Sequence, residues 1–272
     1  MIYLDILCLF RLGNHVEGIS VRTVGIAAAK ARYIGLLCAN LAIWTSAACG
    51  AEYCARGPRV EAVDLSAPVN QNFLNEIKAI GIKTVIRYYD HEDETLPGKT
   101  LRRGERDAIV SNGLKAAVVF QHRNNQFASF TPMRGRQDAE RSLTLAAENL
   151  QPRGSAIYFG VDGAWSAPYQ LANIMAYFGE VRATLAGSGY RVGVYGSGLV
   201  CNTLLTNGLA ELCWLAAPTS WPYYYEYYQT NKWRLVQLST TQCGGRSVDF
   251  NLGNGTDVDY GQFGQSLDVT LR

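Results

Sequence analysis

The sequence has almost no net charge, because 25 Lys and Arg residues face 23 Asp and Glu residues and leave a formal +2. It also lacks a basic run or a basic helix. Nucleic-acid binding rests on a positive surface patch that neutralises phosphates, so we expect no nucleic-acid partner. Only 18% of the residues are charged, whereas 48% are hydrophobic, a composition that excludes a disordered chain.

Several motifs are absent as well. The sequence has no CxxC pair and no cluster of Cys and His, so nothing predicts a metal site. The GxGxxG turn of dinucleotide-binding domains and the P-loop are also missing. We therefore expect neither a metal nor an organic cofactor.

The chain has no long apolar run near its N-terminus. The apolar stretch at 33–44 covers about a dozen residues, fewer than the roughly 20 that a transmembrane helix needs. Lys30 and Arg32 precede it, and small residues follow at 46–51. A basic flank, a short apolar core and a zone of small residues predict a signal peptide. An uncleaved anchor or a buried helix is the alternative.

We divide the chain into an N-terminal extension with a signal peptide (1–50), a linker (51–60) and a globular domain (61–272). The mature protein is expected to be a secreted or periplasmic, cell-envelope monomer without a stable transmembrane domain. In such an oxidising compartment cysteines form disulfides. If Cys49 is lost with the leader or lipidated, three pairings are open to the remaining Cys54, Cys201, Cys213 and Cys243.

From residue 61 on, short apolar runs alternate with amphipathic stretches. Composition and length predict strands at 61–65, 83–89, 115–120, 156–161, 191–195, 212–216 and 234–238, and a short final strand carrying residues 257–259. Helical spacing predicts helices at 70–80, 100–112, 136–150, 168–185 and 198–206. Repeated strand–helix units indicate a parallel α/β sheet, and a doubly wound sheet and a barrel both fit the pattern.

Polar residues stand where these hydrophobic strands end. In a parallel barrel the active site lies at the C-terminal ends of the strands, so Asp64, Asp162 and Asp259 are the candidate catalytic acids at one common mouth. Each Asp taken alone fits equally well as a helix cap or a turn former. The candidate substrate-binding residues near strand ends are Arg87, Tyr88, Gln121, Tyr195, Trp214, Gln237 and Asp257.

Two of these features have other interpretations. In the alternative interpretation Arg87 binds no substrate and instead neutralises buried acids, which need a partner. The stretch at 221–228 is rich in Tyr and Trp, and its rings suit either packing or stacking on sugars.

Five segments resemble one known family. They are AVDLSAP at 62–68, IRYY at 86–89, AIYFGVD at 156–162, GVYGS at 193–197 and TDVD at 256–259. They are similar to strands of the glycoside-hydrolase-like domain first described in a secreted mycobacterial protein, over roughly residues 61–263. That family is in turn similar to family 25 lysozymes, which cleave the glycan strand of peptidoglycan. The resemblance implies a TIM-like (β/α) barrel, incomplete or irregular in its last units.

The resemblance also assigns roles. Family 25 enzymes carry Asp-x-Glu at the end of the fourth strand, where this chain has Gly160 and Asp162. Because glycoside hydrolysis needs two carboxyl groups, it implies Asp162 as general acid, with Asp64 or Asp259 as its partner. We expect a secreted glycoside-hydrolase-like protein acting on cell-wall glycan of the peptidoglycan type. The alternatives are a catalytically inactive carbohydrate-binding barrel of the envelope and a purely structural envelope protein.

Overall fold

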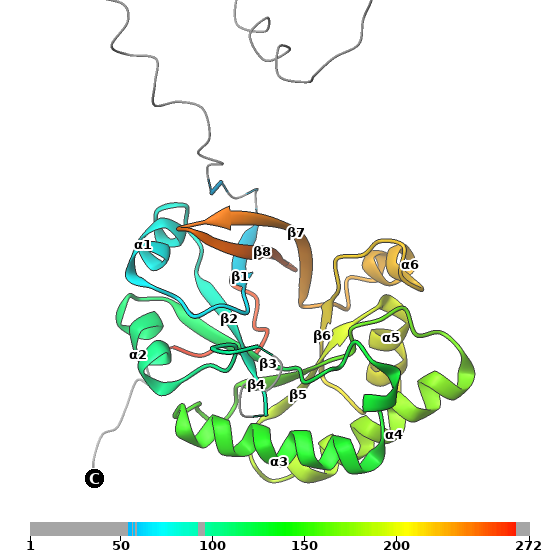
Figure 1. Cartoon of the computed structure of the whole chain (residues 1–272). Helices are drawn as coiled ribbons and strands as arrows, with labels where there is room; N and C mark the ends of the chain where they lie inside the picture. The colour runs from blue at the N-terminus through cyan, green and yellow to red at the C-terminus, as the bar shows by residue number, and fades with distance from the viewer. Residues whose placement is uncertain (1–53, 56, 58, 92–95, 265–272) are drawn as a thin grey trace, which may run out of the picture. The chain divides into compact units, whose positions relative to one another are not determined.

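A closed barrel of eight strands forms the centre of the domain (Figure 1). The computed structural model describes residues 54–264, apart from 56, 58 and 92–95, so the predicted signal peptide and much of the linker lie outside the described residues. The strands, in barrel order, are β1 (Val60–Asp64), β2 (Thr84–Tyr89), β3 (Lys115–Phe120), β4 (Ala156–Gly160), β5 (Arg191–Gly196), β6 (Leu212–Leu215), β7 (Leu235–Cys243) and β8 (Arg246–Gly253).

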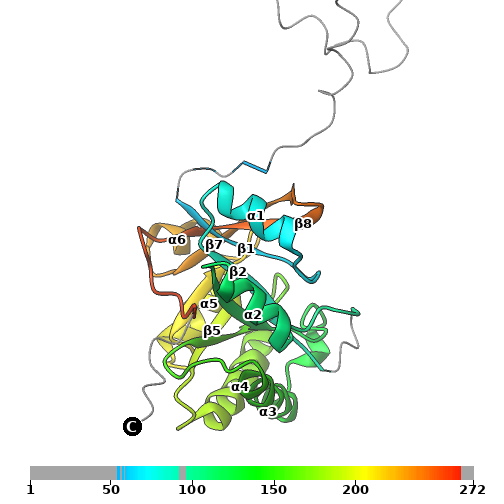
Figure 2. The ribbon, with the colours of Figure 1, turned by 90° about the vertical axis from the view of Figure 1, so that its left-hand side faces the viewer.

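Helices follow the strands on the outside of the barrel (Figures 1 and 2). They are α1 (Gln71–Ala79), α2 (Arg103–Ser111), α3 (Pro132–Glu148), α4 (Pro168–Leu185), α5 (Gly198–Thr206) and α6 (Tyr224–Gln229), with a 3-10 turn, η2, at Phe127–Ser129. Side-chain caps fix several starts, as where Asn70 accepts a hydrogen bond from the Phe73 N–H at 2.8 Å. Within the described residues no helix combines the length and apolar character required to span a membrane.

The barrel is regular up to β7 and irregular after it. β1 to β7 run parallel, but β8 follows β7 by a hairpin and pairs antiparallel with both β7 and β1. A hairpin needs no crossover helix, so no helix separates the last two strands. The predicted TIM-like barrel with irregular last units is confirmed.

Alternation along the strands creates two apolar cores. One lies between the barrel and the helices and includes Val63, Phe120 and Phe159. The other fills the barrel interior, where Ile86, Tyr158, Trp214 and other inward-facing residues pack together. The barrel interior is therefore filled below its C-terminal end, and within the barrel the mouth above this layer is the place left for a site.

The predicted final strand at 257–259 is wrong. Among the described residues the last strand is β8, and the chain after it crosses the N-terminal end of the barrel. There the Tyr260 hydroxyl donates to Thr84 Oγ1 at 2.7 Å, and the Tyr158 hydroxyl donates to the Tyr260 carbonyl at 2.8 Å. Residues 257–263 thus cover the N-terminal end of the barrel, and we call this segment the floor. The eighth strand is β8 and not this segment.

Two disulfides resolve the pairing that the sequence left open. Cys201 at the start of α5 bonds to Cys213 in β6, a separation of 12 residues. Cys54 bonds to Cys243 at the end of β7, a separation of 189 residues. The turn beyond Cys243 also packs on α1, because a Cβ on Gly244 would lie 2.4 Å from the Phe73 Cα (Figure 2). The Cys54–Cys243 bond and the contact of Gly244 with α1 both hold the β7–β8 hairpin against the rest of the domain.

We expect the two disulfides to differ in their effect on stability. A cross-link that closes a longer loop removes more entropy from the unfolded chain, about 5 kcal/mol for the Cys54–Cys243 loop against about 3 kcal/mol for the Cys201–Cys213 loop. The pair Cys54→Ala and Cys243→Ala should therefore lower the free energy of unfolding in urea more than the pair Cys201→Ala and Cys213→Ala. Equal losses would contradict this expectation.

Candidate functional site at the barrel mouth

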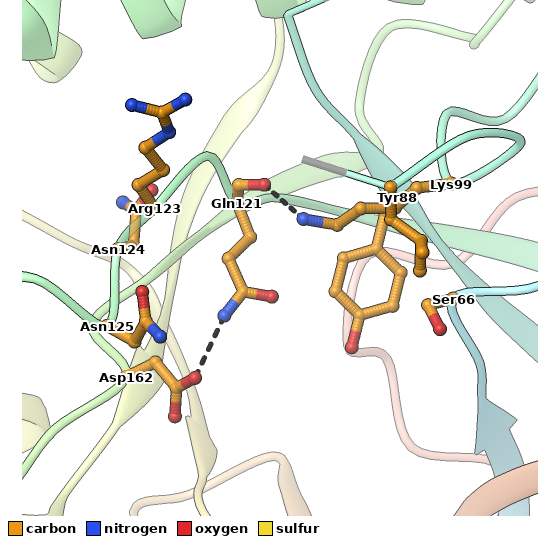
Figure 3. Close-up of a pocket in the computed structure, with 9 residues that line it drawn as sticks. Ser66, Tyr88, Lys99, Gln121, Arg123, Asn124, Asn125 and Asp162 are labelled. Carbon is orange, nitrogen blue, oxygen red and sulfur yellow. Dashed lines mark hydrogen bonds between the residues drawn. The ribbon is translucent and has the colours of Figure 1, made fainter. Parts of the chain in front are cut away.

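Polar and aromatic side chains line two adjoining hollows at the mouth. The inner one, about 180 Å³, is lined by Tyr88, Val119, Gln121, Asp162, Tyr195, Trp214, Gln237 and Asp249. The outer one, about 410 Å³, is lined by Ser66, Tyr88, Leu96, Lys99, Gln121, Arg123, Asn124, Asn125 and Asp162 (Figure 3). Tyr88, Gln121 and Asp162 line both, so the two hollows form one polar cleft.

Asp64 ends β1 and is buried in a ring of hydrogen-bond donors. Asn251 Nδ2 donates to Oδ2 at 2.8 Å, Gln237 Nε2 to the same oxygen at 3.2 Å, and the Tyr88 hydroxyl to Oδ1 at 3.3 Å. Trp214 Nε1 in turn donates to Asn251 Oδ1 at 2.7 Å. The carboxyl group is therefore held in one orientation.

The surroundings of Asp64 also raise the pKa of its carboxyl group. Burial, and after it the neighbouring charge of Asp249, raise the pKa of the Asp64 carboxyl from 3.8 to about 7. The three hydrogen bonds from Asn251, Gln237 and Tyr88 act in the opposite direction. Near neutral pH this acid exists in both protonation states.

Asp249 is a third carboxyl at the mouth, and the sequence-based prediction missed it. It lies on β8 directly opposite Asp64 on β1, is half-buried, and accepts hydrogen bonds from Gln237 Nε2 at 3.2 Å and from the Thr240 hydroxyl. The signal was present in the sequence: Gly244-Gly245 separates two runs with strand character, which is a hairpin pattern. An antiparallel last strand brings its early residues, not its end, to the mouth.

Asp162 follows β4 and lies on the other side of the inner hollow. Its backbone N–H donates to the Asn124 carbonyl at 3.0 Å, and Gln121 Nε2 donates to Oδ2 at 3.1 Å (Figure 3). Burial raises the pKa of the Asp162 carboxyl, while the Gln121 hydrogen bond and the charge of Lys99 lower it. Lys99, another residue that the sequence did not indicate, lies over the Tyr88 ring at 5.1 Å from its centre.

Asp259 and Asp257 do not reach the mouth, contrary to the prediction. Asp259 pairs with Arg191, the first residue of β5, at 2.8 Å, and its side chain is 68% exposed. Asp257 pairs with Lys83, just before β2, at 2.6 Å. Both therefore lie at the N-terminal end of the barrel, because the segment that carries them is the floor and not the last strand.

Arg87 also lies away from the cleft. Its side chain leaves the outer face of β2, where it is fully buried and pairs with Glu105 of α2 at 2.6 Å. It also donates to the Leu65 and Gly98 carbonyls, at 2.6 and 3.0 Å. Strand alternation explains this position, since Tyr88 faces inward and its neighbours must face outward. Arg87 ties the β1 end to α2 and does not line the cleft.

The other predicted residues meet at the mouth. Tyr88, Gln121, Tyr195, Trp214 and Gln237 all line the inner hollow. The Tyr195 hydroxyl donates to Gln237 Oε1 at 2.7 Å, which orients the Gln237 amide so that its NH2 faces the two carboxyls. Trp214 is buried and forms part of the lining below them.

The aromatic stretch at 221–228 divides between packing and exposure. Tyr224 and Tyr227 of α6 are buried, and the Tyr228 ring stacks on Tyr224 and on Trp233. Tyr223 and Tyr225 are exposed. The packing interpretation accounts for the first group.

A family model covers most of the barrel. The model described as "Rv2525c-like, glycoside hydrolase-like domain" matches residues 75–260, which is more than half of the chain. The chain belongs to this family. Membership in the glycoside hydrolase-like family agrees with the barrel and with the polar cleft at its mouth.

The glycoside hydrolase-like family includes a solved relative with the same fold. The Tat-secreted protein Rv2525c of Mycobacterium tuberculosis, solved in complex with HEPES and with L-tartrate, is 22% identical with a TM-score of 0.61, over 75% of this chain and 98% of that one. An uncharacterized protein of B. stearothermophilus is 19% identical with a TM-score of 0.51, over 71% of this chain and 95% of that one.

A curated relative is longer than this chain. The uncharacterized protein FadG of Bacillus subtilis (strain 168) is 25% identical over 204 residues, which are 72% of this chain and 35% of that protein. The chain thus spans about a third of the length of that relative. Within the described part of the glycoside hydrolase-like domain, no group of three or more His, Cys, Asp or Glu side chains could hold a metal ion.

The raised pKa of Asp64 predicts how stability depends on pH. The folded chain binds this proton up to about pH 7 and the unfolded chain only to about pH 4, so the Asp64 contribution is favourable at low pH and is lost as pH rises between these values. Asp64→Asn keeps the neutral form at every pH. It should leave the free energy of unfolding similar at pH 4 and raise it at pH 8 by about 2–4 kcal/mol relative to wild type.

Urea unfolding of both proteins from pH 4 to pH 8 measures this difference. If the free energies of unfolding of wild type and Asp64→Asn changed in parallel with pH across this range, the assignment of a raised pKa to Asp64 would be contradicted.

Proposed function

We propose that the domain hydrolyses glycosidic bonds of a cell-wall glycan of the peptidoglycan type at the barrel mouth. One observation supports the proposal: Asp162, just after β4, and Asp249, on β8, line the same inner hollow although they lie far apart in the chain, and Asp64 of β1 is buried next to Asp249. Glycoside hydrolysis needs two carboxyl groups on either side of the bond. The strand motifs resemble the glycoside-hydrolase-like family, which is in turn similar to family 25 lysozymes, and this similarity supports the choice of glycan.

Asp162 is the general acid in this proposal. It is half-buried, lines both hollows, and burial raises its pKa, so it keeps a proton to higher pH than an exposed Asp. In the reaction its carboxyl proton passes to the glycosidic oxygen as the bond from that oxygen to the anomeric carbon breaks.

Asp249 supplies the second carboxyl, with Asp64 behind it. Asp249 lines the inner hollow together with Asp162, whereas Asp64 is only 2% exposed. The Asp249 carboxylate either attacks the anomeric carbon or takes a proton from the attacking water. Gln237 Nε2 holds it by a hydrogen bond at 3.2 Å, and a proton on Asp64 relieves the repulsion between the two acids.

Export of the protein belongs to the same proposal. The predicted signal peptide precedes the domain, and two disulfides stabilise it, as is usual for proteins of oxidising compartments. The related Rv2525c is a Tat-secreted protein. A protein exported across the membrane has access to a cell-wall glycan.

Replacement of the acid tests the proposal. Asp162→Asn should lower the release of reducing ends from purified peptidoglycan by about 100-fold or more, because a general acid contributes about that much, and should leave glycan binding in a pull-down assay largely intact. Asp249→Asn should have a similar effect. Asp257→Asn and Asp259→Asn are matched controls, since both acids lie at the opposite end of the barrel.

If the wild type releases reducing ends and Asp162→Asn releases them at a similar rate, Asp162 is not the general acid. Absence of release by the wild type, with binding that depends on the cleft residues, would instead support a carbohydrate-binding barrel without catalysis. The anomeric configuration of the first product distinguishes attack by Asp249 from attack by water.

A further inference from the structure

Gln121 and Gly160 lie side by side on the inner face of the barrel at the mouth. The β3–β4 register pairs Phe120 with Phe159, so the next residues along the two strands are Gln121 and Gly160. Gly160 is the last residue of β4, two positions before Asp162. Any side chain at 160 would therefore enter the space beside Gln121.

The Gln121 side chain fills that space. A Cβ built on Gly160 would lie 3.3 Å from Gln121 Cγ, 3.5 Å from Cβ and 3.7 Å from Cδ. Contact at 3.3 Å is already tight, and a branched side chain would have to displace the glutamine. Glycine at this position allows the Gln121 chain to lie across β4 toward Asp162.

The backbone of Gln121 is held on both sides. Its N–H donates to the Tyr89 carbonyl at 3.1 Å, and its carbonyl accepts a hydrogen bond from Lys99 Nζ at 2.5 Å (Figure 3). Lys99 is buried and pairs with Asp90 at 3.2 Å. With the backbone fixed, the amide of Gln121 reaches Asp162 directly, at 3.1 Å.

A side-chain amide differs from other partners in that it both donates and accepts. Its NH2 donates to a carboxylate, and after a half-turn about its last bond its oxygen accepts the O–H of a protonated acid. In the structure Nε2 faces Asp162 Oδ2, the arrangement that suits the charged form. A lysine partner would favour the charged form alone, and a second carboxylate would favour the protonated form alone.

We propose that Gln121 is the positioning residue of Asp162, holding the carboxyl through an amide that donates most strongly to its charged form and can also accept from its protonated form, and that Gly160 provides the space for it. The inference rests on the proposed role of Asp162 as general acid, which must gain and lose a proton in each cycle.

Other groups also act on the Asp162 carboxyl. Lys99 lowers its pKa, and the further titratable side chains that line the two hollows beside it are Tyr88, Arg123, Tyr195 and Asp249. Arg123 extends away from Asp162 (Figure 3). Gln121 is the side chain that hydrogen-bonds the carboxyl directly, so its replacement should have the largest effect.

Gln121→Met tests the proposal, since it keeps the chain length and removes the amide. The pKa of Asp162, followed by carboxyl ¹³C NMR and assigned with Asp162→Asn, should rise by about one, because the lost hydrogen bond is stronger to the charged carboxylate than to the protonated acid. The alkaline limb of the rate of reducing-end release should move up by the same amount, and kcat should fall by about tenfold with a smaller change in KM.

Two further variants and a control complete the design. Gly160→Val leaves Gln121 in the sequence but displaces its side chain, so it should reproduce the pKa shift of Gln121→Met. Gln121→Glu should raise the pKa of Asp162 more than Gln121→Met does. Gln151→Met is the matched control, because Gln151 is buried and hydrogen-bonds Ser155 and Ala156 at the start of β4, away from Asp162.

The outcomes separate this inference from the proposed function. An unchanged pKa of Asp162 in Gln121→Met, or an equal shift in Gln151→Met, overturns the inference. A pKa shift confined to the Gln121 and Gly160 variants supports it even if the wild type releases no reducing ends, in which case the proposed hydrolysis fails and the positioning of Asp162 stands.

Discussion

The antiparallel pairing of β8 with β1 is the constraint on which the site depends. It closes the barrel and, by its register, sets Asp249 opposite Asp64. Two acids so close cannot both be charged without a large electrostatic penalty, and the buried one retains its proton to about pH 7. Asn251, from the same strand, and Gln237 then hold the pair in place. A parallel eighth strand would present its other end to the mouth and would lack this arrangement.

The parallel part of the barrel was predictable because its signals are local. Short β-branched runs alternate with helical spacing, and polar residues such as Tyr88, Gln121 and Asp162 stand where strands end. Asp64 and Asp162 could be placed at the mouth by the strand-end rule alone. Arg87 shows the limit of that rule, because one residue decides whether a side chain faces the cleft or the helices.

The last part of the chain was not predictable in the same way. Asp257 and Asp259 sit in a short pattern that resembles a strand end, but tertiary contacts of Tyr260 with Thr84 and Tyr158 make that segment a floor. Asp249 was missed because the direction of a strand follows from its connection, and a glycine turn reverses it. The role of Lys99 depends on contacts with residues that follow other strands, which no local pattern reports.

The Cys54–Cys243 bond has a mechanical consequence for the two strands that carry Asp64 and Asp249. Cys54 lies six residues before β1, and its partner ends β7, next to the hairpin turn. Tension applied upstream of Cys54 therefore passes into the hairpin as well as into β1, the two elements that carry Asp249 and Asp64. While the bond is intact, separation of β1 from the barrel is therefore coupled to displacement of the hairpin.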